Sequence, residues 1–304
     1  YQARVAFSQL DGALSRRSQD DIIAGARVEI SSAKKDPSDF VLWKPKKPEE
    51  PDSAAFSSPW GLGRPGWHIE CSAMAKSILG DVFDIHAGGN DLIFPHHENE
   101  IAQSCCANDS NQMARTWLHN GMLMVEGQKM SKSLGNFFTV RDLLAEGHRG
   151  ETLRLSLLSG HYRAPLDFTQ AKQVEAKNRL DSWYRAWDGV APADEVPAAV
   201  LNAVRDDMNT PQAFAEIDTL KGNPAQLAAA AQFLGLLTMS PDEWFQGGAA
   251  EGDLTPEAID ALIVERADAK KAKNFARADE IRDQLTDAGI VLEDGAGGTT
   301  WRRS

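Results

Sequence analysis

Two lysines bracket small hydroxyl residues in the run Lys129-Met130-Ser131-Lys132-Ser133. Lysine ammonium groups on a loop suit a site that must bind and then release a polyphosphate, because they offset phosphate charge without fixed geometry. The alternative is an ordinary basic surface loop. The residues around it are rich in serine, glycine and asparagine, which predicts a loop rather than a helix or strand. We call residues 129–138 the lysine loop.

A second set of reactive residues lies upstream, where Cys71 precedes His96 and Glu100. Positions four apart share one face of a helix, so His96 and Glu100 can converge on one ion. Thiolate, imidazole and carboxylate groups all bind zinc. The alternative is a buried cysteine near a polar helix cap. Residues 97–99 occupy neighbouring helix positions that point elsewhere, so we leave them out of the predicted metal site.

The elements that carry these residues alternate between helix and strand. The pattern predicts a helix over 67–79, a strand over 82–86 and a helix over 96–106, with a glycine turn between the last two. Thr139 has the character of a helix N-cap. Residues 61–150 therefore indicate an α/β segment built on a parallel sheet.

Residues 1–60 have a different composition, with short strand candidates at 26–30 and 40–43 between proline-rich connectors. They indicate a small inserted connective module. The chain opens within the alternating run Tyr1-Gln2-Ala3-Arg4-Val5, without an initiator methionine. We interpret this as the cut end of a longer chain.

Two further segments follow the α/β part. Apolar residues recur at helical spacing over 151–245, which predicts a helical bundle. A glycine-rich linker then leads into residues 254–304, the terminal module. Helices are expected there at 256–273 and 275–288, before a hairpin over 290–302.

Composition limits the classes of protein. The chain has 304 residues, of which 42% are hydrophobic and 25% charged, enough for more than one core. No apolar stretch approaches the roughly 20 residues of a membrane span, and the odd cysteine count argues against a disulfide framework. The net charge of −12 argues against bulk attraction to nucleic acid, so local lysine and arginine clusters would have to bind it. A cytoplasmic protein without membrane contact is expected.

Several longer runs together resemble one family, the cysteinyl-tRNA synthetases, which are class I aminoacyl-tRNA synthetases. They follow the family's order and extend over almost the whole chain: 63–72, 94–104, 129–138, 161–163, 207–211, 289–295 and 299–303. The family's His-Ile-Gly-His-like tetrapeptide and its amino-terminal zinc cysteine do not occur in the sequence. The resemblance therefore implies the second half of a Rossmann-like catalytic domain, followed by a helical bundle that contacts the tRNA stem and a small mixed α/β anticodon-binding module.

The resemblance also assigns roles to residues of the α/β segment. It implies a zinc ion held by Cys71, His96 and Glu100, together with a further cysteine that this sequence lacks. Trp67 and His86 match positions that line the cysteine pocket, although packing alone could also explain both. The ATP-binding positions that it implies are Gly88, Gly89, Asp91 and Lys132.

The implied activity is ATP-dependent formation of cysteinyl-adenylate, with Mg²⁺, and transfer of the cysteinyl group to cysteine tRNA. Lys129 and Lys132 are the implied catalytic lysines, and Lys132 would balance charge on the ATP phosphates as pyrophosphate leaves. Without the family's amino-terminal half, we expect this fragment to be inactive alone. Two alternatives stay open: a mycothiol-type cysteine ligase, and a non-catalytic fragment that binds tRNA or zinc.

Partners follow from the same resemblance. Cysteine, ATP and cysteine tRNA are expected, with the missing amino-terminal half as a further partner for an otherwise monomeric chain. In the terminal module, Lys270 and Arg302 are candidate phosphate contacts, and Asp279 and Asp294 are candidate acceptors for base edges.

Overall fold

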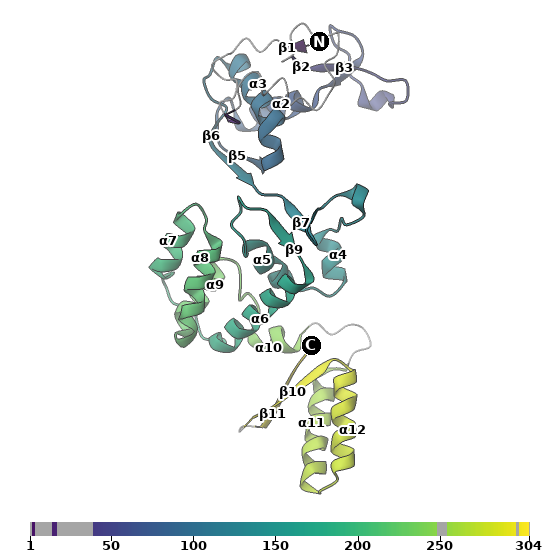
Figure 1. Cartoon of the computed structure of the whole chain (residues 1–304), viewed down its shortest axis with the longest axis vertical. Coiled ribbons are helices and arrows are strands. Elements are labelled where there is room, and N and C mark those ends of the chain that lie inside the picture. The colour runs from purple at the N-terminus through teal and green to yellow at the C-terminus, as the bar shows by residue number, and fades with distance from the viewer. Residues whose placement is uncertain (1, 4–13, 17–38, 248–253, 296–297, 304) are drawn as a thin grey trace. The chain divides into compact units, whose positions relative to one another are not determined.

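The structure is a computed structural model that describes residues 2–3, 14–16, 39–247, 254–295 and 298–303. The chain forms two compact units: Tyr1–Met122 with Tyr162–Pro165, and Leu123–His161 with Leu166–Ser304 (Figure 1). The segment predicted as one α/β part, 61–150, thus contributes to both units. Among the described residues, no helix combines the length and apolar character needed to cross a membrane.

Two parallel strands form the sheet of the first unit. Strand β5 (Phe83–Gly89) pairs in register with β6 (Ala114–Asn120). Helix α2 (Trp67–Leu79) precedes β5 and packs against α3 (Glu98–Asn108), which lies between the two strands in sequence. The parallel α/β arrangement predicted from the sequence is confirmed here.

The predicted helix at 96–106 starts late, and the reason is local. Phe94 has extended backbone angles before Pro95, because proline disfavours a helical residue in front of it. A short π-helical turn, η3 (Ile93–His97), follows a 3₁₀ turn, η2 (Asn90–Leu92), and leads into α3. The predicted strand likewise extends three residues further than expected, to Gly89.

Short antiparallel pairs surround this core. Strand β1 (Gln2–Ala3) pairs with β2 (Phe40–Val41), and β3 (Trp43–Pro45) pairs with β4 (Gly63–Pro65). A 3₁₀ turn, η1 (Asp52–Ala54), lies between β3 and β4. The strand candidate at 40–43 corresponds to β2 and the start of β3, whereas the candidate at 26–30 lies outside the described residues.

The second unit begins with a three-stranded sheet. Strand β7 (Leu123–Val125) pairs with β8 (Gln128–Lys129) on one side and with β9 (Leu166–Phe168) on the other. The lysine loop follows β8 and contains a 3₁₀ turn, η4 (Lys132–Leu134). Helix α4 (Val140–Ala145) then begins with a capping box from Thr139, as predicted.

The expectation of an all-helical 151–245 segment is wrong at β9. Leu166 and Phe168 lie two apart, and Phe168 is buried against Leu143 and Leu153, so this short stretch completes a sheet instead of a helix turn. The helices of the segment are α5 (Gly150–Leu158), α6 (Gln170–Trp187), α7 (Ala198–Arg205), α8 (Thr210–Asp218), η5 (Thr219–Gly222), α9 (Pro224–Phe233) and α10 (Pro241–Gln246). Their shared core includes fully buried Leu180, Trp183 and Phe214.

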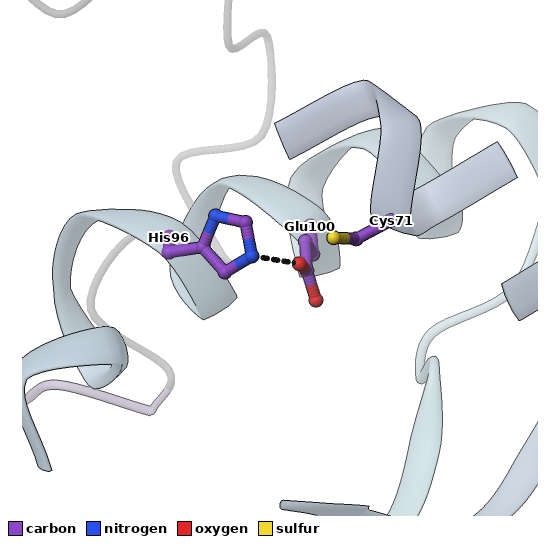
Figure 2. A group of neighbouring side chains, drawn as sticks. All are labelled: Cys71, His96 and Glu100. Atoms are coloured by element: carbon purple, nitrogen blue, oxygen red, sulfur yellow. Dashed lines mark ion pairs between the residues drawn. The ribbon is translucent and has the colours of Figure 1, made fainter. Parts of the chain in front are cut away.

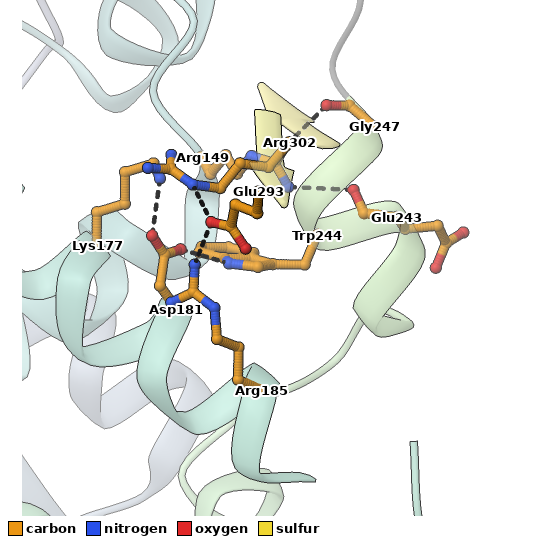
Figure 3. A network of polar contacts seen from close by, with 9 residues as sticks. All are labelled: Arg149, Lys177, Asp181, Arg185, Glu243, Trp244, Gly247, Glu293 and Arg302. Carbon is orange, nitrogen blue, oxygen red and sulfur yellow. Dashed lines mark hydrogen bonds and ion pairs between the residues drawn. The ribbon is translucent and has the colours of Figure 1, made fainter. Parts of the chain in front are cut away.

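Contacts from distant parts of the chain hold the short helix α10 in place (Figure 3). The Trp244 indole stacks on Tyr184, with 4.5 Å between ring centroids, and donates a hydrogen bond to Asp181 at 2.8 Å. The Arg149 guanidinium donates to the carbonyl oxygens of Glu243 at 3.2 Å and Gly247 at 2.7 Å. These two carbonyls lie in the last turn and C-cap of α10, so a side chain from the start of α5 caps this helix.

The terminal module has its own core. Helices α11 (Pro256–Lys271) and α12 (Phe275–Asp287) pack against the hairpin of β10 (Ile290–Gly295) and β11 (Gly298–Arg303). Ile259, Ile281 and Trp301 are buried between them. Both helices and the hairpin are confirmed within two residues of the predicted ends.

Candidate functional site

Three elements bring the predicted metal ligands together. Cys71 lies in the second turn of α2, His96 in η3, and Glu100 in the first turn of α3. Their ligand atoms all lie within 4.8 Å of one another, and metal–ligand bonds of about 2.0–2.3 Å would draw them to roughly 4 Å. Figure 2 shows the three side chains close together, Cys71 from α2, His96 from η3 and Glu100 from α3. We call these residues the metal cluster.

The Glu100 carboxylate is the most buried group of the metal cluster, with no exposed surface. Its Oε2 lies 2.7 Å from the Nε2 of His86. Its Oε1 lies 2.5 Å from the Nε2 of His96 but makes no well-aligned hydrogen bond among the described residues. Burying a carboxylate is costly, and a cation bound between Glu100, His96 and Cys71 would offset its charge.

The protonation states of the other two ligands can be argued from their surroundings. Burial lowers the pKa of His96, which favours the neutral imidazole that binds metals. Burial and the neighbouring Glu100 raise the pKa of the Cys71 thiol. A cation at this position would reverse that effect by stabilising the thiolate. The donor set therefore fits a divalent metal such as zinc.

Histidines form a second layer that the sequence did not predict. The Nδ1 of His68 lies 2.8 Å from the Nδ1 of His96, and the Nδ1 of His97 lies 2.8 Å from the Nε2 of His119. Desolvation lowers the pKa of His68 and of His97 to about 4, so both are neutral near pH 7. Neutral imidazoles both donate and accept, which lets each of these two pairs form a hydrogen bond.

His97, which the helix positions excluded from the predicted metal site, takes part in an overlapping group. Its ligand nitrogen, one from His86 and a Glu100 oxygen also lie within 4.8 Å of one another. Glu100 is common to both groups. The group with Cys71 adds a thiol to the imidazole and the carboxylate, and thiolate is a ligand that zinc favours, so this group fits a zinc ion better.

The predicted substrate-pocket residues lie directly against the metal cluster. Trp67 stacks on His96, with 4.1 Å between ring centroids, and 52% of its surface is exposed. His86 contacts Glu100 from β5. The two rings therefore border the cluster from α2 and from the sheet.

The predicted ATP-binding glycines lie at the carboxyl end of β5, where ligands bind in parallel sheets. A Cβ atom on Gly88 would come 2.9 Å from the Cε1 of His97, and one on Gly89 would come 2.7 Å from the Oδ1 of Asp91. Neither position has room for a side chain without movement. Asp91 is exposed in η2, immediately after the strand.

The lysine loop lies in the second unit. Lys129 ends β8 and Lys132 begins η4, and both side chains are exposed. The hydroxyl of Ser131 accepts a hydrogen bond from the Leu134 amide at 3.3 Å and so caps η4. The prediction of a loop therefore holds only in part, because Lys129 belongs to a strand and Lys132 to a 3₁₀ turn.

The predicted tRNA contacts in the terminal module already have partners within the protein. Asp294 accepts hydrogen bonds from Arg266 at 3.2 and 3.3 Å, and Lys270 lies 3.6 Å away from it. Asp279 pairs with Arg282, and Arg302 pairs with Glu293. Only Lys270 and Asp294 of the four predicted residues are therefore joined directly.

Comparisons with known proteins agree in all parts of the chain. Residues 3–178 match the family described as tRNA synthetases class I (C) catalytic domain, and residues 253–302 match the cysteinyl-tRNA ligase anticodon binding domain. The cysteine–tRNA ligase of Paramagnetospirillum magneticum is 55% identical over 312 residues, covering 96% of this chain and 67% of the relative. That of Acidiphilium cryptum is 53% identical, covering 96% and 66%. The chain thus spans about two thirds of the length of these relatives.

Proposed function

The chain belongs to the cysteinyl-tRNA synthetases, a class I family, and we propose that residues 1–304 carry the metal centre, lysine loop and tRNA-binding parts of a cysteine–tRNA ligase. The reaction would activate cysteine with ATP as cysteinyl-adenylate, release pyrophosphate and transfer the cysteinyl group to cysteine tRNA. The observation that carries the proposal is the convergence of Cys71, His96 and Glu100 inside the matched catalytic segment.

Cys71, His96 and Glu100 would hold a zinc ion. Zinc bound there supplies a preference for a sulfur ligand over a hydroxyl oxygen, which would separate cysteine from serine. The chain itself buries Glu100 fully and covers one face of His96 with Trp67. Excluding water there strengthens the electrostatic interactions of the ligands.

The remaining substrate contacts would come from the sheet and the loop. The backbone of Gly88 and Gly89 would border the adenosine at the end of β5, and the exposed Asp91 carboxylate can accept hydrogen bonds from ribose hydroxyls. Lys129 and Lys132 would offset the charge that develops on the ATP phosphates as pyrophosphate leaves. Magnesium would accompany ATP as part of the substrate.

Cysteine-dependent ATP–pyrophosphate exchange tests this function. We expect a polypeptide of residues 1–304 to show no measurable exchange alone, because it lacks the family's His-Ile-Gly-His-like tetrapeptide. Losing one electrostatic donor already costs about 2.7–4 kcal/mol. The amino-terminal part of a full-length family member, added as a separate polypeptide, should restore exchange. Cysteine should support this exchange, and serine should not.

Two outcomes would count against the proposal. Strong exchange by residues 1–304 alone would show that the catalytic groups are misplaced. No exchange in any combination, with both polypeptides folded, would reject the ligase activity.

The terminal module would recognise the tRNA anticodon, and the helical bundle would contact its stem. Deleting residues 254–304 should sharply weaken binding of cysteine tRNA. The core of the module is separate from that of the bundle, so the shortened protein should still fold. Unchanged tRNA affinity would favour a ligase for a small amine, such as the mycothiol-type enzyme, which needs no anticodon module.

A further inference from the structure

One side chain bridges the lysine loop from within. The Oδ1 of Asn136 accepts a hydrogen bond from the Ser131 amide at 2.8 Å, and its Nδ2 donates to the Lys129 carbonyl at 3.3 Å. A single carboxamide therefore holds the backbone on both sides of Met130. The segment that it holds is the one that separates the two catalytic lysines.

The chain turns back to make this bridge possible. Gly135 has φ = 68°, a left-handed conformation that residues with a side chain rarely adopt, and it directly precedes Asn136. The bridge also needs a short side chain that donates and accepts at once. Aspartate would keep only the acceptor, and alanine would keep neither.

The ammonium group of Lys132 lies over the ring of Phe137, the residue next to Asn136. Its Nζ lies 5.5 Å from the ring centroid of Phe137, the residue after Asn136, and 48% of the Phe137 surface is exposed. A cation over an exposed aromatic ring is held weakly, so the ammonium can leave for a phosphate. The backbone beneath it stays fixed by Asn136.

We propose that Asn136 is a positioning residue for pyrophosphate release, which fixes the backbone of Lys129 and Lys132 so that both ammonium groups meet the ATP phosphates together. This inference rests on the proposed function. The physical reason is that an electrostatic donor acts in the transition state only when it is already in place. A displacement of about 1 Å can lower a rate by about 100-fold.

The first test measures steady-state pyrophosphate exchange in the assembly that contains residues 1–304. Asn136→Ala should lower kcat by about 10- to 100-fold while the KM for ATP changes less than about threefold. Asn136→Asp should give an intermediate loss. Asn202→Ala, an exposed asparagine in α7, is the matched control and should leave both constants unchanged.

A double-mutant cycle separates positioning from a general structural effect. If Asn136 acts through Lys132, then Asn136→Ala should lower kcat less than about twofold further in a Lys132→Ala background. Losses that simply multiply would overturn the inference. An inactive wild-type assembly would instead reject the proposed function on which the inference depends.

Amide hydrogen exchange on the 304-residue chain tests the bridge without any activity. Asn136→Ala should raise deuterium uptake in residues 128–137, and Asn202→Ala should not. Equal uptake in the two variants would show that Asn136 does not hold the loop and would also overturn the inference.

Discussion

The metal cluster and the terminal module use charged side chains in opposite ways. In the metal cluster, Glu100 has no exposed surface, and its Oε1 contacts His96 without a well-aligned hydrogen bond. In the terminal module, the side chain of Asp294 is 56% exposed and yet has Arg266, Lys270 and Thr299 as partners. The buried Glu100 carboxylate thus lacks a full set of hydrogen bonds, whereas the exposed Asp294 carboxylate has its partners within the protein.

The difference follows from what each region is proposed to bind. An ion site gains by holding its ligands ready, because the ion supplies the missing partner and no internal contact has to break. On a surface that binds nucleic acid, carboxylates without a partner would repel the phosphates. Ion pairs within the protein would reduce that repulsion before binding. If the module binds tRNA as proposed, its paired charges would exchange partners on binding.

The largest expected effect is loss of metal from the cluster. Cys71→Ala removes a thiolate ligand and should weaken zinc binding by more than about 100-fold, because even residues that only orient ligands contribute 10- to 100-fold. Metal content after dialysis against a competing chelator measures this. Cys106→Ala, an exposed cysteine outside the cluster, should retain zinc as the wild type does. Equal zinc content in both variants would contradict the ligand assignment.

A smaller loss is expected at His86, which contacts Glu100 at 2.7 Å and is not in the cluster itself. His86→Ala should lower zinc affinity by about 10- to 100-fold, because Glu100 loses a partner that orients it. His86→Asn, which keeps a donor, should lose less. His148→Ala in the second unit controls for general effects of removing a histidine. An unchanged zinc affinity in His86→Ala would show that His86 does not orient Glu100 and that the helix alone does.

Weaker still is the expected effect of one lysine in the terminal module. Lys270→Ala should reduce affinity for cysteine tRNA only a few-fold, with the salt slope of log K falling by roughly 1 if one phosphate contact is lost. Lys271, one residue further on α11, pairs with Asp268 and serves as the control. Titrations at several salt concentrations would distinguish them. Equal slopes for both variants would remove Lys270 from the phosphate contacts.

The smallest expected effect concerns the acid stability of the module. The hydrogen bond from Arg266, then Thr299, holds the pKa of Asp294 well below its ordinary 3.8. The folded state thus binds fewer protons than the unfolded state, so the stabilisation is complete above about pH 4 and is lost as pH falls through the folded pKa. Asp294→Asn should lower the melting temperature at pH 7 by no more than about 4 °C, because the pair is exposed. This difference should shrink below pH 4, and a difference that grew there would contradict the assignment.

Spacing alone predicted part of the metal cluster. The four-residue separation of His96 and Glu100 brought both onto one face, and their convergence is observed. Cys71 lies far from them in sequence, so ligand chemistry could only suggest that it joins the pair, and the resemblance to a family strengthened that suggestion. His68 and His119 carried no such signal, because their contacts depend on how α2, η3 and β6 pack.

The same difference between local and distant contacts separates the parts of the fold that the sequence predicted from those that it did not. The helices and hairpin of the terminal module follow local periodicity and turn residues, and the sequence predicted them well. Strand β9 does not follow a local pattern, because its three residues become a strand only by pairing with β7, some 40 residues earlier. The ion-pair partners of Arg302 and Asp279 within the protein could not be predicted either, because any nearby acidic or basic residue can supply them.

The capping of α10 by Arg149 has a consequence for the order of folding. Arg149 meets carbonyls 94 and 98 positions later in the chain, and a helix of six residues is too short to persist by itself in water. During synthesis, α5 and α6 must therefore wait for residues up to Gly247 before this corner of the bundle can close. A nascent chain stopped before Trp244 would leave the stacking face of Tyr184 uncovered.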